Sequence, residues 1–330
     1  MKKPTLFTAL PEEFVCTPDG MEIDKNGDLI ISCPNYADRK LSGCVLRVTK
    51  DRKISKWFDV ILHPETGVAR NMGIAFDKDY NLYICDNQGW YEEEEVLFKG
   101  RVLKVKFHED GTVKQTTVVA EHMEHPNGIR IKGNYMYLTQ SYLHRQKTES
   151  GKLMSCVYRF RLEDENLQMK NTLEDPQIFA TFLTENPDCQ YGADGIAFGP
   201  DGNLYVGNFG DGEIIKILVD EKGDYIGQST YAKDFSNMES TDGMVFDEKG
   251  NLYVADFCAN AIAKVTPQGT VLRYAQSPDC DGLDGGLDQP GEPIIWQGKL
   301  IVSCFDLVTG PGKVNTAHEL PATMAQLELE

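Results

Sequence analysis

The sequence predicts an all-β fold: one six-bladed β-propeller domain over residues 1–330, with four strands in each blade. Three observations support this prediction. A strand–turn–strand phrase occurs six times, its copies begin about every 50 residues, and turn sequences such as Asp-Lys-Asn-Gly separate the two short strands of a copy. A repeat of this length with four short strands is typical of propeller blades.

Each copy of the phrase supplies the first two strands of a blade. The copies are TPDGMEIDKNGDLIIS from Thr17, RNMGIAFDKDYNLYIC from Arg70, HPNGIRIKGNYMYLTQ from His125, GADGIAFGPDGNLYVG from Gly192, TDGMVFDEKGNLYVAD from Thr241 and the degraded PGEPIIWQGKLIVSC from Pro290. Alternating apolar residues predict the third strands, each followed by a fourth, at Cys44–Lys50, Arg101–Phe107, Cys156–Leu162, Glu213–Val219 and Ile262–Thr266.

The last blade lacks a fourth strand of its own, because the chain ends soon after the segment MAQLELE. Pro4–Leu10 belongs to no other blade, so we expect it to supply the missing strand. Such a closure would join the two ends of the chain and remove an open sheet edge.

Composition argues against several classes of partner. The net charge of −18 is unfavourable for binding nucleic acid or an anionic membrane surface, and no apolar run approaches the ~20 residues that span a bilayer. The start of the sequence lacks the apolar segment and cleavage site of a signal peptide. Nine scattered cysteines without CxxC spacing favour reduced thiols. We therefore expect a cytoplasmic protein that acts on a small molecule.

The first polar residue of each phrase is expected to stand at one mouth of the central channel. The second strand of each blade runs back to the same face, and four of the loops that follow it are long: Cys33–Gly43, Asp86–Gly100, Gln140–Ser155 and Cys304–Lys313. Binding sites often lie on loops that a rigid scaffold holds in place. The predicted ring of polar residues consists of Asp19, Asn71, Asn127, Asp194, Asp242 and Glu292.

Four members of this ring are carboxylates, and no basic residue occupies a ring position. Two carboxylates ~5 Å apart repel by roughly 3 kcal/mol at an effective dielectric constant near 20. A divalent cation would cancel this repulsion, and carboxylate and amide oxygens suit calcium, magnesium or manganese. The alternative is that Asp-Gly and Asn-Gly before a strand are turn sequences only. Six polar residues at one structural position favour the cation.

Two further residues lie in the third long loop. His144 and Arg145 could meet an anionic or carbonyl substrate there, although a solvated loop explains them equally well. The sequence contains no GxSxG motif, P-loop or dinucleotide-binding fingerprint.

The phrases PNGIRI, ADGIAF and TDGMVFDEKGNLYVADF, on a six-fold repeat, resemble the family of senescence marker protein, gluconolactonase and luciferin-regenerating enzyme, to which diisopropylfluorophosphatase is related. The resemblance is strongest from Tyr191 to Gly269. It implies one divalent cation at the channel mouth, held by a glutamate from the first blade, asparagines from the third and fourth, and an aspartate from the fifth. These ligands fall on Asp19, Asn127, Asp194 and Asp242. Asp19 and Asp194 depart from the family's residue types.

The resemblance implies a metal-dependent hydrolase that opens a lactone. Asp242 would then activate the attacking water or attack directly, and Asn71 and Glu292 would be further substrate contacts. A second interpretation keeps this machinery for another activated carbonyl, such as hydrolytic C–C cleavage of a cyclic dione. A third is a binding or scaffold propeller with a structural cation; it predicts an aromatic or apolar rim, with ring carboxylates paired to basic residues.

Overall fold

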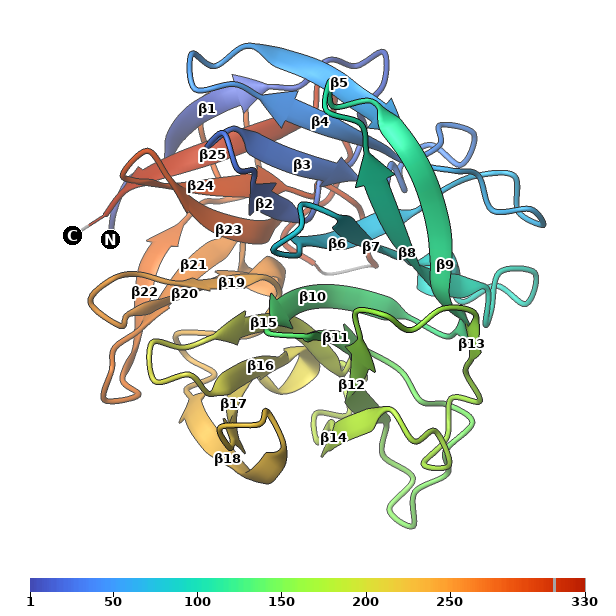
Figure 1. Ribbon diagram of the computed structural model, residues 1–330. Coiled ribbons are helices and arrows are strands. Elements are labelled where there is room, and N and C mark those ends of the chain that lie inside the picture. Colours follow the sequence, from blue (N-terminus) through green and yellow to red (C-terminus); the bar gives the residue numbers. More distant parts are fainter. Residues whose placement is uncertain (311–312, 330) are drawn as a thin grey trace.

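Six antiparallel sheets surround a central channel in the computed structural model, which describes residues 1–310 and 313–329 (Figure 1). The predicted six-bladed propeller is confirmed. The second strand of a blade is fully buried, as in LIISC of Leu29–Cys33, because the neighbouring blades cover both of its faces. Such strands read as continuous apolar runs instead of alternating ones.

The strands follow the chain from the channel outwards in each blade. The first three blades contain β2 (Met21–Ile23), β3 (Leu29–Cys33), β4 (Cys44–Val48) and β5 (Ile54–Asp59); β6 (Asn71–Phe76), β7 (Leu82–Asp86), β8 (Gly100–Phe107) and β9 (Val113–Met123); and β10 (Pro126–Lys132), β11 (Tyr135–Gln140), β12 (Met154–Arg161) and β14 (Ile178–Leu183). The short β13 (Leu167–Gln168) pairs in parallel with β9 and adds a fifth strand to the second blade.

The remaining blades repeat this order. They contain β15 (Ala193–Phe198), β16 (Leu204–Asn208), β17 (Glu213–Val219) and β18 (Tyr225–Lys233); β19 (Met244–Phe246), β20 (Leu252–Asp256), β21 (Ala261–Val265) and β22 (Val271–Gln276); and β23 (Pro290–Trp296), β24 (Lys299–Cys304), β25 (Thr323–Glu328) and β1 (Thr5–Ala9).

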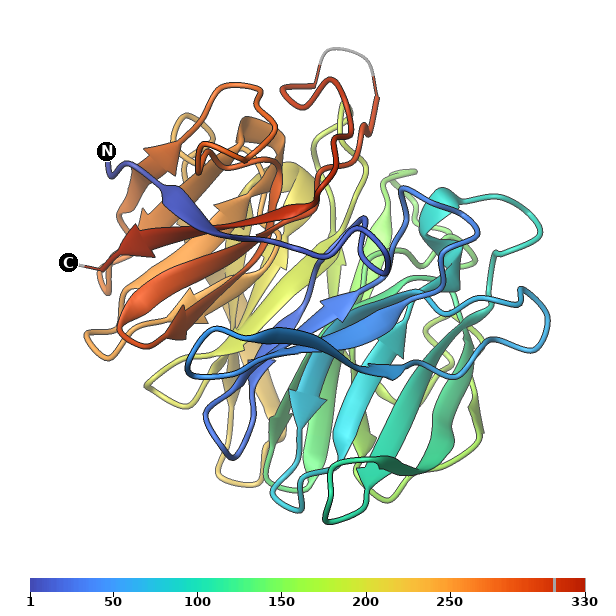
Figure 2. The same ribbon diagram turned by 90° about the horizontal axis from the view of Figure 1, so that it is seen from above.

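The N-terminal strand β1 closes the sixth blade, as the sequence predicts. It pairs antiparallel with β25, with Thr5 opposite Gln326 and Ala9 opposite Thr323. Both views show the two ends of the chain side by side at the edge of this blade (Figures 1 and 2). The ring of Phe7 packs edge-on against Trp296, with 5.8 Å between ring centres. The closure therefore buries apolar surface as well as backbone hydrogen-bonding groups.

Three single-turn 3₁₀ helices follow second strands at the mouth face: η1 (Gln88–Tyr91), η2 (Phe209–Asp211) and η3 (Phe257–Ala259). In the described part of the chain, no helix is both long and apolar enough to cross a bilayer. The apolar core lies between blades. One of its clusters, for example, joins Ile30 and Val45 of the first blade to Ile74, Ile84 and Leu103 of the second. Packing between blades thus fixes the innermost strands around the channel.

Candidate metal centre and ligand cavity

The pairing of the innermost strands identifies the side chain that each blade presents at the channel mouth. In four blades the pairing is interrupted at the same place, between Asn71 and Ile74, Pro126 and Ile129, Ala193 and Ile196, and Pro290 and Pro293. The residues that directly follow Asn71, Pro126, Ala193 and Pro290 therefore occupy equivalent positions in their blades. With the two remaining blades, the mouth residues are Asp19, Met72, Asn127, Asp194, Asp242 and Gly291.

This register corrects the prediction for the second blade by one residue; in the sixth blade Gly291 has the mouth position, and Glu292 lines the channel from the next position. Asn71 lies behind the ring, where its Nδ2 donates to Ser32 Oγ at 2.7 Å and to the carbonyl of Cys44 at 2.9 Å. Glu292 occupies the position that Gly243 has in the fifth blade, and its Oε1 accepts from Arg130 Nη2 at 2.5 Å. In the second blade the one-residue shift turns the Asn71 side chain away from the ring, because successive residues of a strand face opposite sides.

The structure does bring together Asp19, Asn127, Asp194 and Asp242. Asp19, Asn127 and Asp194 are buried and Asp242 is partly buried, and all four line one narrow cavity in the channel, together with Glu292. Asn127 donates from Nδ2 to Tyr191 Oη at 3.1 Å, which leaves its Oδ1 for a ligand. Asp242 Oδ1 accepts from the backbone N–H of Gly243 at 2.8 Å.

A close approach between strands explains why glycine follows Asp242. A Cβ atom at position 243 would lie 2.0 Å from Glu292 Oε2 and 2.7 Å from the Cα of Glu292. Only glycine fits there, and its amide orients the aspartate. Gly243 thus lies in the contact between the fifth and sixth blades, and the Asp-Gly pair forms part of the channel wall.

The cluster carries more negative charge than its protein surroundings balance. Burial, followed by repulsion from Glu292, raises the pKa of Asp19 to about 7. Burial also raises the pKa of Asp194 and Asp242 well above the usual range, with added repulsion between the ring carboxylates. Among the described residues, only Glu292 of these carboxylates has a basic partner. Three carboxylates and one amide oxygen fit a hard divalent cation.

Above this cluster lies a cavity of about 370 Å³, whose walls are mainly aromatic. Neighbouring rings contact one another in sequence, with centres 4.8 to 5.9 Å apart from Tyr191 through to Trp90. Tyr142 lies 5.2 Å from Tyr191 and donates to Glu92 Oε1 at 2.9 Å, on the loop that also carries Trp90. We call these residues the aromatic collar: Trp90, Tyr142, Tyr191, Phe209, Phe257 and Phe305.

The sequence interpretation missed this collar, although a signal for it exists. Phe209, Phe257 and Phe305 each come directly after the last residue of a second strand, where the chain reaches the mouth face. Tyr36 supports the collar from the first blade by stacking on Trp90 at 4.9 Å. Aromatic residues at strand ends can be found in the sequence, but which rings meet depends on how the loops fold.

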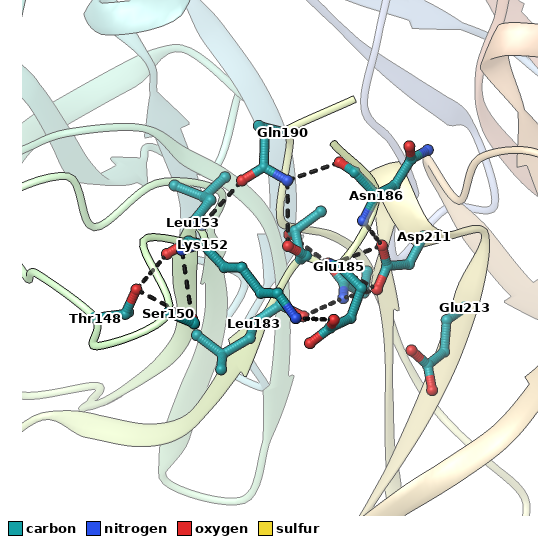
Figure 3. Close-up of polar contacts among 12 residues, drawn as sticks. Thr148, Ser150, Lys152, Leu153, Leu183, Glu185, Asn186, Gln190, Asp211 and Glu213 are labelled. Atoms are coloured by element: carbon teal, nitrogen blue, oxygen red, sulfur yellow. Dashed lines mark hydrogen bonds and ion pairs between the residues drawn. The ribbon is translucent and has the colours of Figure 1, made fainter. Parts of the chain in front are cut away.

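The segment that carries Tyr191 is held by polar contacts from two blades (Figure 3). Gln190 Oε1 accepts from the backbone N–H of Leu153 at 3.0 Å, and its Nε2 donates to the carbonyl of Asn186 at 2.7 Å. Asp211 Oδ1 accepts from the backbone N–H groups of Glu185 and Asn186 at 2.9 and 2.8 Å. These bonds fix the turn before Tyr191 and so the position of its hydroxyl group.

Tyr191 links the carboxylate cluster of the channel to a buried histidine. Its Oη lies 2.7 Å from His125 Nε2 as well as 3.1 Å from Asn127 Nδ2. Burial and the nearby His144 lower the pKa of His125 to about 3, so the imidazole is neutral at pH 7. This chain of hydrogen bonds positions the Asn127 amide from behind.

Two thiols also line the cavity. A hydrogen bond with Cys258 and the charge of Lys313 lower the pKa of Cys189 to about 7, against the opposing effect of burial. All nine cysteines lie in the described part of the chain, and none forms a disulfide. Cys189 is therefore a partly ionised thiol facing the cavity.

His144 and Arg145 lie outside the cavity lining, in contrast to their predicted role. His144 stacks on the outer side of Tyr142, and its Nδ1 is 2.8 Å from Glu124 Oε1. The guanidinium of Arg145 lies 3.7 Å from the centre of the Phe98 ring. Both contacts direct the charged groups to other parts of the loops, because Tyr142 already occupies the inward position.

Comparison with known proteins agrees with the predicted resemblance. Residues 192–281, which include Asp194 and Asp242, match the family description "SMP-30/Gluconolactonase/LRE-like region". No curated protein sequence matches the chain.

Several solved structures share the fold. A luciferin-regenerating enzyme superposes with a TM-score of 0.65 at 12% identity, covering 100% of this chain and 96% of its own. A calcium-binding regucalcin from Agrobacterium tumefaciens gives 0.62 at 12%, with 100% and 94% coverage. A gluconolactonase from Xanthomonas campestris gives 0.60 at 16%, with 100% and 96% coverage. At these identities the likeness establishes the fold alone.

Proposed function

We propose that this protein is a divalent-metal-dependent hydrolase that opens a small cyclic ester in the cavity beneath the aromatic collar. The observation that carries the proposal is a set of three carboxylates that have no basic partner among the described residues, beside one amide oxygen, in the channel beneath that cavity. The matched family and the gluconolactonase among the similar structures support the reaction class.

Asp19, Asn127, Asp194 and Asp242 would hold the cation through side-chain oxygens. Calcium, magnesium and manganese all prefer such donors. A bound divalent cation polarises a carbonyl oxygen and stabilises negative charge that develops on it. The extra charge of Asp194, where the family has an amide, favours tighter retention of the cation.

Asp242 is the residue proposed to act on the substrate. The amide of Gly243 holds one of its oxygens at 2.8 Å, so the other can face the cavity that Asp242 also lines. That oxygen could accept a proton from the attacking water or attack the carbonyl carbon itself. Both roles require an ionised carboxylate, which a neighbouring cation would favour despite the burial.

The cavity walls favour a substrate with a flat, apolar body. Aromatic side chains bind such groups by stacking, whereas the polar groups on the walls are few: Glu92, Thr309 and Lys313 besides the tyrosine hydroxyls. A lactone with an apolar substituent fits this description better than a polyhydroxylated one. A cyclic dione offers a similar shape and an activated carbonyl, so it is the second substrate class for the same machinery.

A substrate panel tests the proposal. Purified protein is assayed with lactones, phosphotriesters and cyclic diketones, with each of Ca²⁺, Mg²⁺ and Mn²⁺ and with a chelator. We expect metal-dependent turnover of an apolar lactone. Turnover of a dione alone would show that the substrate is a ketone and not an ester. Activity that survives complete chelation would rule out the metal-dependent reaction.

The collar also favours a second candidate function, a binding or scaffold propeller, because an aromatic rim is one of the features expected for it. The other expected feature is met only by the pair of Glu292 and Arg130. Cation removal separates the two functions. A scaffold would lose thermal stability and have no turnover to lose, whereas the hydrolase would lose turnover while it remains folded.

A further inference from the structure

A second group of oxygen ligands lies in the sixth blade, outside both channel cavities. One carboxylate oxygen from each of Asp288, Asp306 and Glu319 lies within 4.8 Å of the other two. Asp288 precedes β23, Asp306 follows β24, and Glu319 precedes β25. Two connections thus bring their acidic side chains to one point: the one before β23 supplies Asp288, and the one between β24 and β25 supplies Asp306 and Glu319.

Two buried oxygens at this group have no hydrogen-bond donor among the residues that the structure describes. Asp288 is 2% exposed, and its Oδ1 has no partner. Asn315, also 2% exposed, donates from Nδ2 to Asp306 Oδ1 at 3.2 Å, while its own Oδ1 has no partner. Buried polar atoms in native proteins are nearly always paired with protein, water or an ion, so these two acceptors are available to a water or a cation.

Among the described residues, the one base in contact with this group is His318, which pairs with Asp306 and not with Asp288 or Glu319. His318 Nδ1 lies 3.0 Å from Asp306 Oδ2, which also accepts from the backbone N–H of Glu319 at 2.8 Å. No described ion pair reaches Asp288 or the side chain of Glu319. Burial and repulsion from Asp306 and Glu319 raise the pKa of Asp288 to about 8.

We propose that Asp288, Asp306, Asn315 and Glu319 form a second divalent-cation site, separate from the proposed catalytic centre. Three carboxylates and an amide oxygen, without sulfur or imidazole ligands, suit Ca²⁺, which accepts six to eight oxygens including waters. The site joins the connection before β23 to the connection between β24 and β25. It also lies next to Phe305, the neighbour of Asp306 in the sequence, and so supports the part of the collar that this blade supplies.

Calcium titration of the chelated protein by calorimetry tests the site. We expect two bound Ca²⁺ ions for the wild type and for the control Asp284→Asn, which changes an exposed acid on the same connection as Asp288. Asp288→Asn should retain the channel ion and bind the second at least about tenfold more weakly, because one anionic ligand is lost. Asp242→Asn should affect the other ion and leave this one unchanged.

Glu319→Gln gives an independent answer if Asp288→Asn does not fold, because Glu319 is only partly buried. Unchanged calcium binding in a folded Asp288→Asn or Glu319→Gln variant would overturn the second site. A single wild-type ion that only Asp242→Asn weakens would overturn it too. A single ion that only the sixth-blade variants weaken would support this site and contradict the proposed catalytic centre.

Discussion

Asp242 is both part of the channel wall and the residue proposed to act on the substrate. Its backbone N–H bonds to Ala255, its Oδ1 accepts from Gly243, and its carboxylate lines both the narrow channel cavity and the collar cavity. Its position in the strand therefore depends on the backbone. The carboxylate charge is not needed for that position, and this separates the structural role of the residue from the chemical one.

Asp242→Asn should leave the fold intact and remove the chemistry. Stability without metal should hold or rise slightly, since one repelling charge disappears, while cation affinity falls. Turnover at saturating metal should fall by about 10²–10⁴-fold, the usual contribution of a general base. Steady-state kinetics with metal occupancy measured in parallel provide the test.

Glu248→Gln, an exposed change in the same blade, is the matched control. Near-normal turnover of Asp242→Asn at full metal occupancy would show that Asp242 only binds the cation. If the variant is unfolded, Asp242 is instead a structural turn residue.

The raised pKa of Asp19 predicts an unusual pH dependence of stability. Its value of about 7 in the fold exceeds the 3.8 of an unperturbed aspartate, so between these pH values the native state binds more protons than the unfolded state. Stability from this group is present at low pH and lost as pH rises through 7. Buried neutral His125, whose pKa is lowered to about 3, acts in the opposite sense below pH 6.5.

Asp19→Asn isolates the contribution of Asp19. In chelator, the difference in melting temperature between this variant and the wild type should grow as pH rises from 5 to 8, with the variant more stable. Saturating cation should reverse the order, since the wild type then gains the ligand. A difference that is constant with pH would show that Asp19 keeps an ordinary pKa.

Cys189 should be the most reactive thiol of the protein near pH 7. Its pKa of about 7 gives it a substantial thiolate fraction, whereas burial raises the pKa of Cys156 well above the usual range. We expect iodoacetamide at pH 7.5 to label Cys189 first, as measured by peptide mass spectrometry, and to reduce turnover by filling the cavity. Equal labelling of Cys189 and Cys280, whose pKa is raised to about 11, would contradict the assignment.

At the scale of elements, the sequence predicted every blade and the closing strand because these depend on local patterns. Apolar runs, turn residues and a period near 50 define the strands before any contact is known. The register of the innermost strands is different. Asn71 was expected on the ring, but the interrupted pairing of β6 with β7 places Met72 there. A single residue decides the face, and only the partner strand shows which residue it is.

The aromatic collar is a second feature that the sequence alone does not predict in full. The sequence shows that Phe209, Phe257 and Phe305 directly follow second strands, yet the cavity also needs Tyr142 and Tyr191 from longer connections. Their positions depend on side-chain contacts between blades, such as those of Gln190 and Asp211. His144 and Arg145 were expected in the site for lack of this information.

Closure by β1 should contribute measurably to stability. Phe7 is 8% exposed and packs on Trp296 across the sixth blade. Phe7→Ala should lower the free energy of unfolding by about 3 kcal/mol, the lower end of the usual cost for a buried phenylalanine. Urea denaturation measures it, with the exposed Thr5→Ala on the same strand as the control. A loss below about 1 kcal/mol would mean that β1 is not an integral part of the blade.

At the scale of the whole molecule, the innermost strands of the six blades meet around the channel, and the propeller therefore gathers negative charge at the channel mouth. The chain as a whole carries a net charge of −18, and its channel mouth holds Asp19, Asp194 and Asp242 without basic partners in the described structure. Cations should therefore stabilise the fold. At a free concentration 100 times the dissociation constant, one bound ion adds about 2.7 kcal/mol.

Differential scanning calorimetry can detect this stabilisation. After chelation, the melting temperature should rise when Ca²⁺, Mg²⁺ or Mn²⁺ is added, and the rise should be smaller for Asp194→Asn, which replaces a charged ligand by a neutral amide. A melting temperature that is independent of cation concentration would contradict a site of useful affinity.

The most direct test of the central claim is the anomalous difference map of a crystal soaked in Mn²⁺. The account predicts a peak in the channel at ligand distance, roughly 2.0–2.6 Å, from side-chain oxygens of Asp19, Asn127, Asp194 and Asp242. A map without a peak among these four residues at millimolar Mn²⁺ would contradict it, and the raised pKa values would then describe protonated carboxyl groups in a binding propeller.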